Sequence, residues 1–180
     1  MKKFALLMKK FAIVLFIVIV VIFAWWNIRP LLVSDVVDEA FPPVIEEMNQ
    51  EEIDAMTEEE KIAMEKKIAP VLTASGNFQG ADDFHQGSGQ ASIYQQADGS
   101  YFLRFENFSV INGPDLKVYL VEEQNPSESQ VTAGFNLGKL KGNKGNQNYV
   151  IPAGVDPADY GSVVIYCKFF KFSFATANLN

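Results

Sequence analysis

The stretch GQASIYQQADGSYFLRFENFSV (residues 89–110) decides the fold, because it places two strand-like runs around a tight turn. The turn contains Asp98-Gly99, a pair that tolerates the backbone conformation a short β-hairpin needs. In the second run the odd-numbered residues from Tyr101 to Phe105 share one face, and the even-numbered residues share the other. This alternation predicts an antiparallel hairpin with one buried face.

Similar runs continue to the C-terminus and extend the hairpin into a larger sheet. They are DLKVYLVE (115–122), FNLGKLKG (135–142), NQNYVIP (146–152) and SVVIYCKFFKFSFATANL (162–179), the last read as one long bent strand or as two. Six to eight short strands with closely spaced turns are typical of an antiparallel β-sandwich or barrel. No ten-residue helical pattern lies between them, which argues against a parallel α/β sheet. The predicted fold class is therefore all-β.

The N-terminal part of the chain is strongly apolar. FAIVLFIVIVVIFAWWNI (residues 11–28) contains no charged residue and is close to the length that crosses a bilayer. Lysines precede it, and Trp25 and Trp26 stand where aromatic residues mark a membrane interface. A cleaved signal peptide would need a small-residue cleavage site that this stretch lacks, so an uncleaved signal anchor is favoured. The positive-inside rule then predicts a single-pass protein with a short cytoplasmic N-terminus and an extracytoplasmic C-terminal domain.

Composition divides the chain into an anchor (1–29), an acidic and largely helical stalk or linker (30–74), and a β domain (75–180). In the acidic part Thr57 and Glu60 form a capping-box pattern, and Asn49 is a second predicted N-cap. The net charge of −7 and the absence of a basic stripe exclude nucleic acid as a partner. The predicted contact with lipid is made by residues 11–28.

Cys167 is the only cysteine, so it cannot form a disulfide within the chain. On a strand it shares a face with Val163, Ile165 and Phe169, which are all apolar. Two interpretations stay open. The thiol is a small buried core residue, as free cysteines often are, or it is an exposed and reactive group.

Two other residues are candidates for chemistry. His85, the only histidine, lies in the polar loop sequence GADDFHQGSGQ, and with Cys167 and Asp82 or Asp83 it does not complete a tetrahedral zinc site. Asp115 follows Gly113-Pro114 and is either a turn residue or a carboxylate held near a site. Nothing forms a nucleophile–base–acid set typical of a hydrolase. The predicted loop 138–149 contains Lys139, Lys141 and Lys144. We expect these lysines to be solvated, and the alternative is that they bind an acidic partner.

Four blocks of the chain, in order, resemble the DM-thirteen domain: SGNFQGADDFHQGSGQASIY, LRFENFSVINGPDLKVYL, LGKLKGNKGNQNYVIPAGVD and SVVIYCKFFKFSFATANL. The resemblance covers residues 75–180 and implies an all-β domain. The family is labelled an electron-transfer domain on the proposal that its cysteine, here Cys167, is redox active. The family's histidine before Gly-x-Gly matches His85, and its Pro-Asp matches Pro114-Asp115.

The resemblance favours a non-enzymatic redox or electron-transfer accessory centred on Cys167. In this hypothesis His85 stabilises a thiolate or shares a metal with Cys167, and Asp115 is a further candidate catalytic residue. The sequence requires no cofactor of its own, and haem or copper would come through a redox-protein partner. The alternative is a cell-surface interaction or ligand-binding module in which Cys167 is only core packing.

Overall fold

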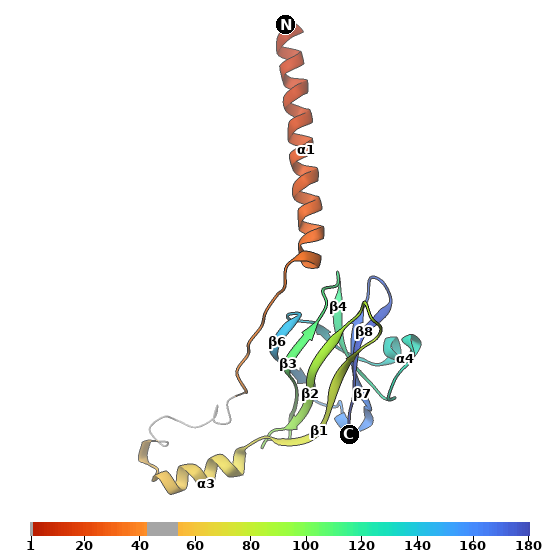
Figure 1. The fold of residues 1–180 in the computed structure, drawn as a ribbon. Helices are drawn as coiled ribbons and strands as arrows, with labels where there is room; N and C mark the ends of the chain where they lie inside the picture. The colour runs from red at the N-terminus through yellow and green to blue at the C-terminus, as the bar shows by residue number, and fades with distance from the viewer. Residues whose placement is uncertain (1, 43–53) are drawn as a thin grey trace.

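The computed structural model describes residues 2–42 and 54–180 (Figure 1). The chain begins with a single long helix, α1 (Lys2–Leu32), that stands away from the rest of the molecule. Its segment Met8–Trp25 is long and apolar enough to cross a membrane, and none of it is buried within the protein. This helix fits the predicted anchoring, and a signal sequence would have the same properties. Its orientation across a membrane stays a prediction.

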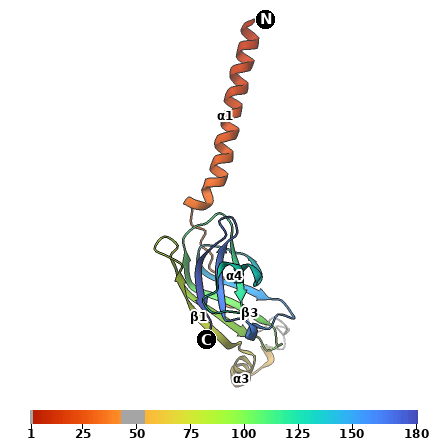
Figure 2. The same ribbon diagram turned by 90° about the vertical axis from the view of Figure 1, so that its right-hand side faces the viewer.

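The rest of the described chain is dominated by one antiparallel sheet of eight strands in the order β5-β4-β7-β8-β1-β2-β3-β6. The strands are β1 (Val71–Gly80), β2 (Gly87–Gln95), β3 (Tyr101–Val110), β4 (Leu116–Val121), β5 (Phe135–Lys139), β6 (Lys144–Ile151), β7 (Ser162–Cys167) and β8 (Phe172–Asn178). The edge strands β5 and β6 follow each other in the sequence, so the sheet curls into a nearly closed barrel (Figure 2). The predicted all-β, antiparallel fold is confirmed.

Each odd-numbered strand turns into the next even-numbered strand at the same end of the barrel. The four loops there are 81–86, 111–115, 140–143 and 168–171, and we call this end the anchor end, because it faces α1 (Figures 1 and 2). Hydrogen bonds join the loops: Ile111 N–H donates to Gln86 O (3.2 Å) and Lys168 N–H donates to Asp115 O (3.0 Å). The loops 96–100, 122–134 and 152–161 lie at the opposite, far end.

The barrel interior is filled by the alternating residues that the sequence predicts. Leu103 and Phe105 of β3 are fully buried, as are Val118 and Leu120 of β4. The Phe105 ring packs edge-on against Phe78, 4.9 Å between centroids, which ties β3 to β1 across the core. The predicted hairpin of β2 and β3 around Asp98-Gly99 is confirmed, with Gln95 paired to Tyr101, and burial of its apolar face stabilises the barrel.

Residues 35–41 form an extended strap along the open edge of β6. Val37 N–H donates to Lys144 O and Glu39 N–H donates to Asn146 O, both at 2.9 Å. The strap therefore covers backbone groups that an edge strand would otherwise leave unpaired. Gly145 permits this approach, because it adopts a φ of 98° and a Cβ there would overlap the carbonyl of Val37.

Three shorter elements complete the described chain. They are the helices α3 (Glu58–Ile68) and α4 (Glu128–Ala133) and the 3-10 turn Pro157–Asp159. The capping box of Thr57 and Glu60 at the start of α3 is confirmed, with Glu60 N–H donating to Thr57 Oγ1 at 3.3 Å. The predicted N-cap Asn49 lies outside the described residues. The division of the chain at residue 74 stays a prediction, while β1 itself begins at Val71.

Candidate functional site

Cys167 is the last residue of β7, and its side chain has no exposed surface. It lies opposite Leu116 of β4 and Phe172 of β8, and it belongs to the same core cluster as Val163 and Ile165. The predicted apolar face is thus confirmed for these residues. The thiol is free and is enclosed by apolar side chains at the anchor end of the barrel.

Phe169 was predicted on the same face as Cys167, and this is wrong. The chain reverses after Cys167 through the turn 168–171, with Lys171 at a φ of 56°, so that β7 and β8 form a hairpin. Phe169 is therefore in a turn and 71% exposed, as is its neighbour Phe170 at 60%. The final run is two strands, one of the two interpretations the sequence allowed.

His85 lies at the end of the loop that joins β1 to β2. Its Nδ1 is 2.9 Å from each carboxylate oxygen of Asp82, and the same carboxylate accepts the backbone N–H groups of Phe84 and His85 at 2.8 and 2.7 Å. The hydrogen bond with the His85 ring is the main cause that holds the pKa of Asp82 below its usual value. The loop is thus organised around Asp82, and this fixes the position of the imidazole.

The imidazole ring of His85 packs against two phenylalanines of β8. Its centroid is 4.8 Å from that of Phe172 and 4.5 Å from that of Phe174. Phe172 is also the strand partner of Cys167, so the two candidate residues share a neighbour. No hydrogen bond between His85 and Cys167 is present among the described residues. The geometry gives His85 a defined place beside the aromatic pair, and its direct action on the thiol stays a proposal.

Asp115 occupies the turn that leads into β4. Its Oδ1 is 3.1 Å from Lys117 Nζ, and its backbone carbonyl accepts the N–H of Lys168, the residue after Cys167. Gly113 of the same loop lies so close to Phe174 that an added Cβ would be 3.0 Å from that ring. Asp115 therefore holds the 111–115 loop against the β7–β8 hairpin, and its carboxylate is engaged by a lysine.

The described residues contain no group of three histidine, cysteine, aspartate or glutamate side chains that could hold a metal ion. A site shared by His85 and Cys167 would need ligands from another molecule. The surface of the described residues has open grooves. One of about 540 Å³ at the anchor end is lined by Ser34, Gln86, Ser109 and Asn112 among others, and one of about 810 Å³ follows the outer side of β1 and β8.

Sequence reasoning missed a buried polar network next to the anchor end. Gln147 has no exposed surface, and its amide donates to Gly142 O at 2.8 Å and accepts from the Tyr149 hydroxyl at 2.8 Å. The Tyr149 oxygen in turn accepts the N–H of Lys141 at 3.0 Å, and burial raises the pKa of this phenol. The only signal in the sequence was a glutamine at an inward-facing position of a predicted strand.

The lysine-rich loop finds an acidic partner within the chain. Lys141 Nζ lies 2.7 Å from Glu39 Oε1 of the strap. Burial alone would raise the pKa of Glu39, but the hydrogen bonds from Lys141 and the Asn148 N–H, with the charges of Lys141 and Arg104, hold this pKa below its usual value. The charge pair adds to the backbone hydrogen bonds that fix the strap.

Comparison with known families gives one match. A family model described as electron transfer DM13 matches residues 77–179, which is more than half of the chain and includes most of the barrel with His85, Asp115 and Cys167. Neither the curated proteins nor the solved structures include a match to this chain. The matched region leaves out α1 and the strap.

Proposed function

Because this chain belongs to the electron transfer DM13 family, we propose that it is a membrane-anchored redox accessory that works at the anchor end of its barrel. One observation carries the proposal: His85 packs against Phe172 and Phe174, and Cys167 pairs with Phe172 at the same end. Asp115 joins this end through its carbonyl, which accepts the N–H of Lys168, the residue after Cys167. We infer further that α1 holds the barrel on the extracytoplasmic side, as the lysines before the apolar stretch favour.

A single thiol must exchange electrons with another molecule. In the proposed reaction the thiolate of Cys167 attacks a disulfide of a partner protein, forms a mixed disulfide with one sulfur and releases the other as a thiolate. Electrons balance without an added oxidant. His85 is the proposed acceptor of the thiol proton. The haem or copper of a redox partner is a second proposed destination for the electron, and in either case the partner supplies the other redox centre.

The buried thiol sets a structural condition on this reaction. Cys167 has no exposed surface, so a partner sulfur reaches it only when the β7–β8 hairpin opens and Phe172 moves. The turn 168–171 is exposed and joins only two strands, which makes it a segment that can open locally at lower cost than global unfolding. Thiol chemistry is thus proposed to be gated by this hairpin.

The experiment measures thiol modification in the full chain, reconstituted in lipid nanodiscs. Intact mass follows the reaction of Cys167 with oxidised glutathione and with iodoacetamide, in the folded state and after denaturation, and the Cys167→Ala variant gives the background. We expect Cys167 in the folded chain to be modified much faster than the chain unfolds globally. His85→Gln should slow this modification in the folded state and leave it unchanged after denaturation. Modification limited to the global unfolding rate would refute a redox thiol. The absorbance spectrum of the same sample detects any bound haem or copper.

A second function is favoured by a specific observation. The complete burial of Cys167 among Val163, Ile165 and Phe172 is also what an inert core residue would show. The chain would then be an interaction or ligand-binding module. The groove of about 810 Å³ along β1 and β8, which includes Asn77, Gln90 and Asn178, is the surface proposed for that role. The nanodisc experiment separates the two, since this module needs no accessible thiol.

A further inference from the structure

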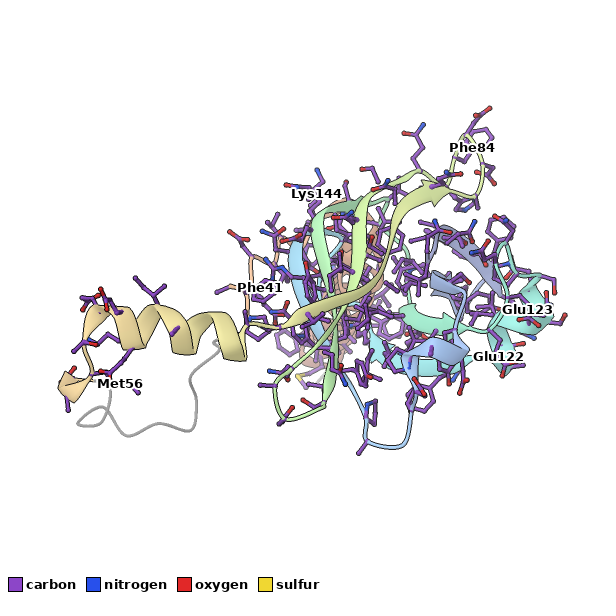
Figure 3. All side chains as sticks on the ribbon, turned by 90° about the horizontal axis from the view of Figure 1, so that it is seen from below. Phe41, Met56, Phe84, Glu122, Glu123 and Lys144 are labelled. Carbon is purple, nitrogen blue, oxygen red and sulfur yellow. The ribbon has the colours of Figure 1, made fainter. Side chains whose placement is uncertain are left out.

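The surface of the barrel is uneven in where it exposes aromatic residues. Three phenylalanines of residues 71–180 are more than half exposed: Phe84 at 81%, Phe169 at 71% and Phe170 at 60%. All three lie in anchor-end loops, two of them in the turn 168–171 and one in the loop 81–86. Figure 3 shows Phe84 at the tip of its loop, pointing away from the core. The far-end loops expose no phenylalanine.

Charge follows the same division. The turn 168–171 reads Lys-Phe-Phe-Lys, and both Lys168 and Lys171 are exposed. The far-end loops 96–100, 122–134 and 152–161 contain no lysine or arginine. Their acidic residues are Asp98, Glu122, Glu123, Glu128, Asp156 and Asp159. Among the loop acids of the anchor end, Asp82 is bonded to His85 and Asp115 to Lys117, while Asp83 is exposed beside Phe84. The barrel is thus polarised, with its exposed aromatic and basic groups at one end.

Contacts made directly after α1 hold the anchor end of the barrel close to the end of this helix. The apolar window ends at Trp25 and α1 ends at Leu32, which is a rise of about 10 Å along the helix. The next residue, Val33, is already held by the barrel, since its carbonyl accepts the side chain of Asn112 at 3.0 Å. The headgroup region adds roughly 5–8 Å on each side of the hydrocarbon. The end of α1, and the anchor-end loops beside it, therefore lie within about 5 Å of the headgroup region.

We propose that the anchor end is a second membrane-binding element, in which Phe84, Phe169 and Phe170 insert at the headgroup boundary and Lys168 and Lys171 bind anionic lipid phosphates. The proposal rests on the anchoring by α1 proposed above, and it commits the patch to the bilayer and not to a protein. Aromatic rings prefer this interface, and basic residues beside them are attracted to anionic lipid. Large apolar side chains that cluster on a protein surface usually mark an interaction site, and here we assign the bilayer to that site.

The test places a nitroxide label at each end of the barrel. Ala81→Cys reports on the anchor end and Ala153→Cys on the far end, each in a Cys167→Ala background so that only one thiol is labelled. The full chain is studied in nanodiscs with phosphatidylcholine alone or with added phosphatidylglycerol. Collisions of the label with oxygen and with a water-soluble nickel chelate give its depth. We expect several-fold fewer nickel collisions at position 81 than at 153, with the difference larger in phosphatidylglycerol.

The substitutions Phe84→Ser, Phe169→Ser and Phe170→Ser together should raise nickel collisions at position 81 to the level at 153. Lys168→Gln with Lys171→Gln should remove only the effect of phosphatidylglycerol. Equal accessibility at 81 and 153 in the unmodified loops would overturn the proposal. So would protection that persists in detergent micelles and rises with protein concentration, because that result identifies a protein contact.

This test is independent of the redox function. The labelled chains have no Cys167 thiol, and incorporation into nanodiscs reports on α1 alone. A chain that incorporates but shows no protection at position 81 contradicts only the second membrane contact. Because the substituted phenylalanines are largely exposed, their replacement should leave the thermal unfolding of the barrel unchanged.

Discussion

Replacing the Cys167 sulfur by oxygen tests how closed the core is around the candidate thiol. In Cys167→Ser a hydroxyl would be buried beside Val163 and Ile165 and opposite Phe172, where apolar side chains give it no partner. An unsatisfied buried polar group costs about 1–3 kcal/mol of the free energy of unfolding. For a domain the size of this barrel, 1 kcal/mol corresponds to a Tm change of roughly 4 °C. We therefore expect the serine variant to unfold about 4–12 °C lower than the natural sequence.

The matched control is Cys167→Ala, which loses a group of about one methylene and creates a small cavity. Its expected cost is about 1 kcal/mol, so its Tm should lie above that of the serine variant. Near-ultraviolet circular dichroism of the full chain in micelles follows the barrel, since the tyrosines and most phenylalanines are there. A serine variant as stable as the natural chain, or more stable than the alanine variant, would show that water reaches the sulfur and would refute the closed core.

Three further outcomes are expected. The pKa of Glu39 is lowered in the folded state, so its carboxylate stabilises the bound strap above the unfolded pKa near 4.5, and this stabilisation is lost as the pH falls through the lower folded pKa. Hydrogen exchange of the strap amides should therefore become faster at acidic pH. Glu39→Gln should remove this pH dependence. Gly145→Ala should detach the strap and lower the free energy of unfolding by about 1–3 kcal/mol, because alanine is strained at this positive φ and its Cβ would overlap the Val37 carbonyl. A crystal structure of the variant with the strap in place would contradict this. Gln147→Leu removes the amide that bonds the backbone of Gly142 and the hydroxyl of Tyr149, so these buried groups lose a partner. The free energy of unfolding in urea should fall by about 1–3 kcal/mol, and an unchanged urea midpoint would contradict this.

Local patterns in the sequence were sufficient for much of the fold. The period-two alternation around Leu103 and Val118, with a turn at Asp98-Gly99, depends only on neighbouring residues, and it predicted strands, buried faces and the hairpin correctly. The capping box at Thr57 was predictable for the same reason. In contrast, α4 has six residues, fewer than two helical turns, and a pattern that short gives no reliable period.

What could not be predicted depends on contacts between distant parts of the chain. The strap is defined by the pairing of Val37 with Lys144, which no local pattern in residues 35–41 indicates. The gathering of His85 and Cys167 around Phe172 follows from the placement of β8 between β7 and β1, a strand order that differs from the order in the sequence. The exposed position of Phe169 required knowing where β7 ends.

The strap also determines where the barrel can meet other molecules. If residues 35–41 were not bonded to β6, they would add up to about 24 Å to the tether between α1 and the barrel. Because they are bonded along β6 instead, this reach is lost, and the barrel stays at the height set by the end of α1. A partner in the same membrane would then be found by lateral diffusion in two dimensions. Encounter rates should accordingly depend on the surface density of the two proteins and on bilayer viscosity, and not on the length of any tether.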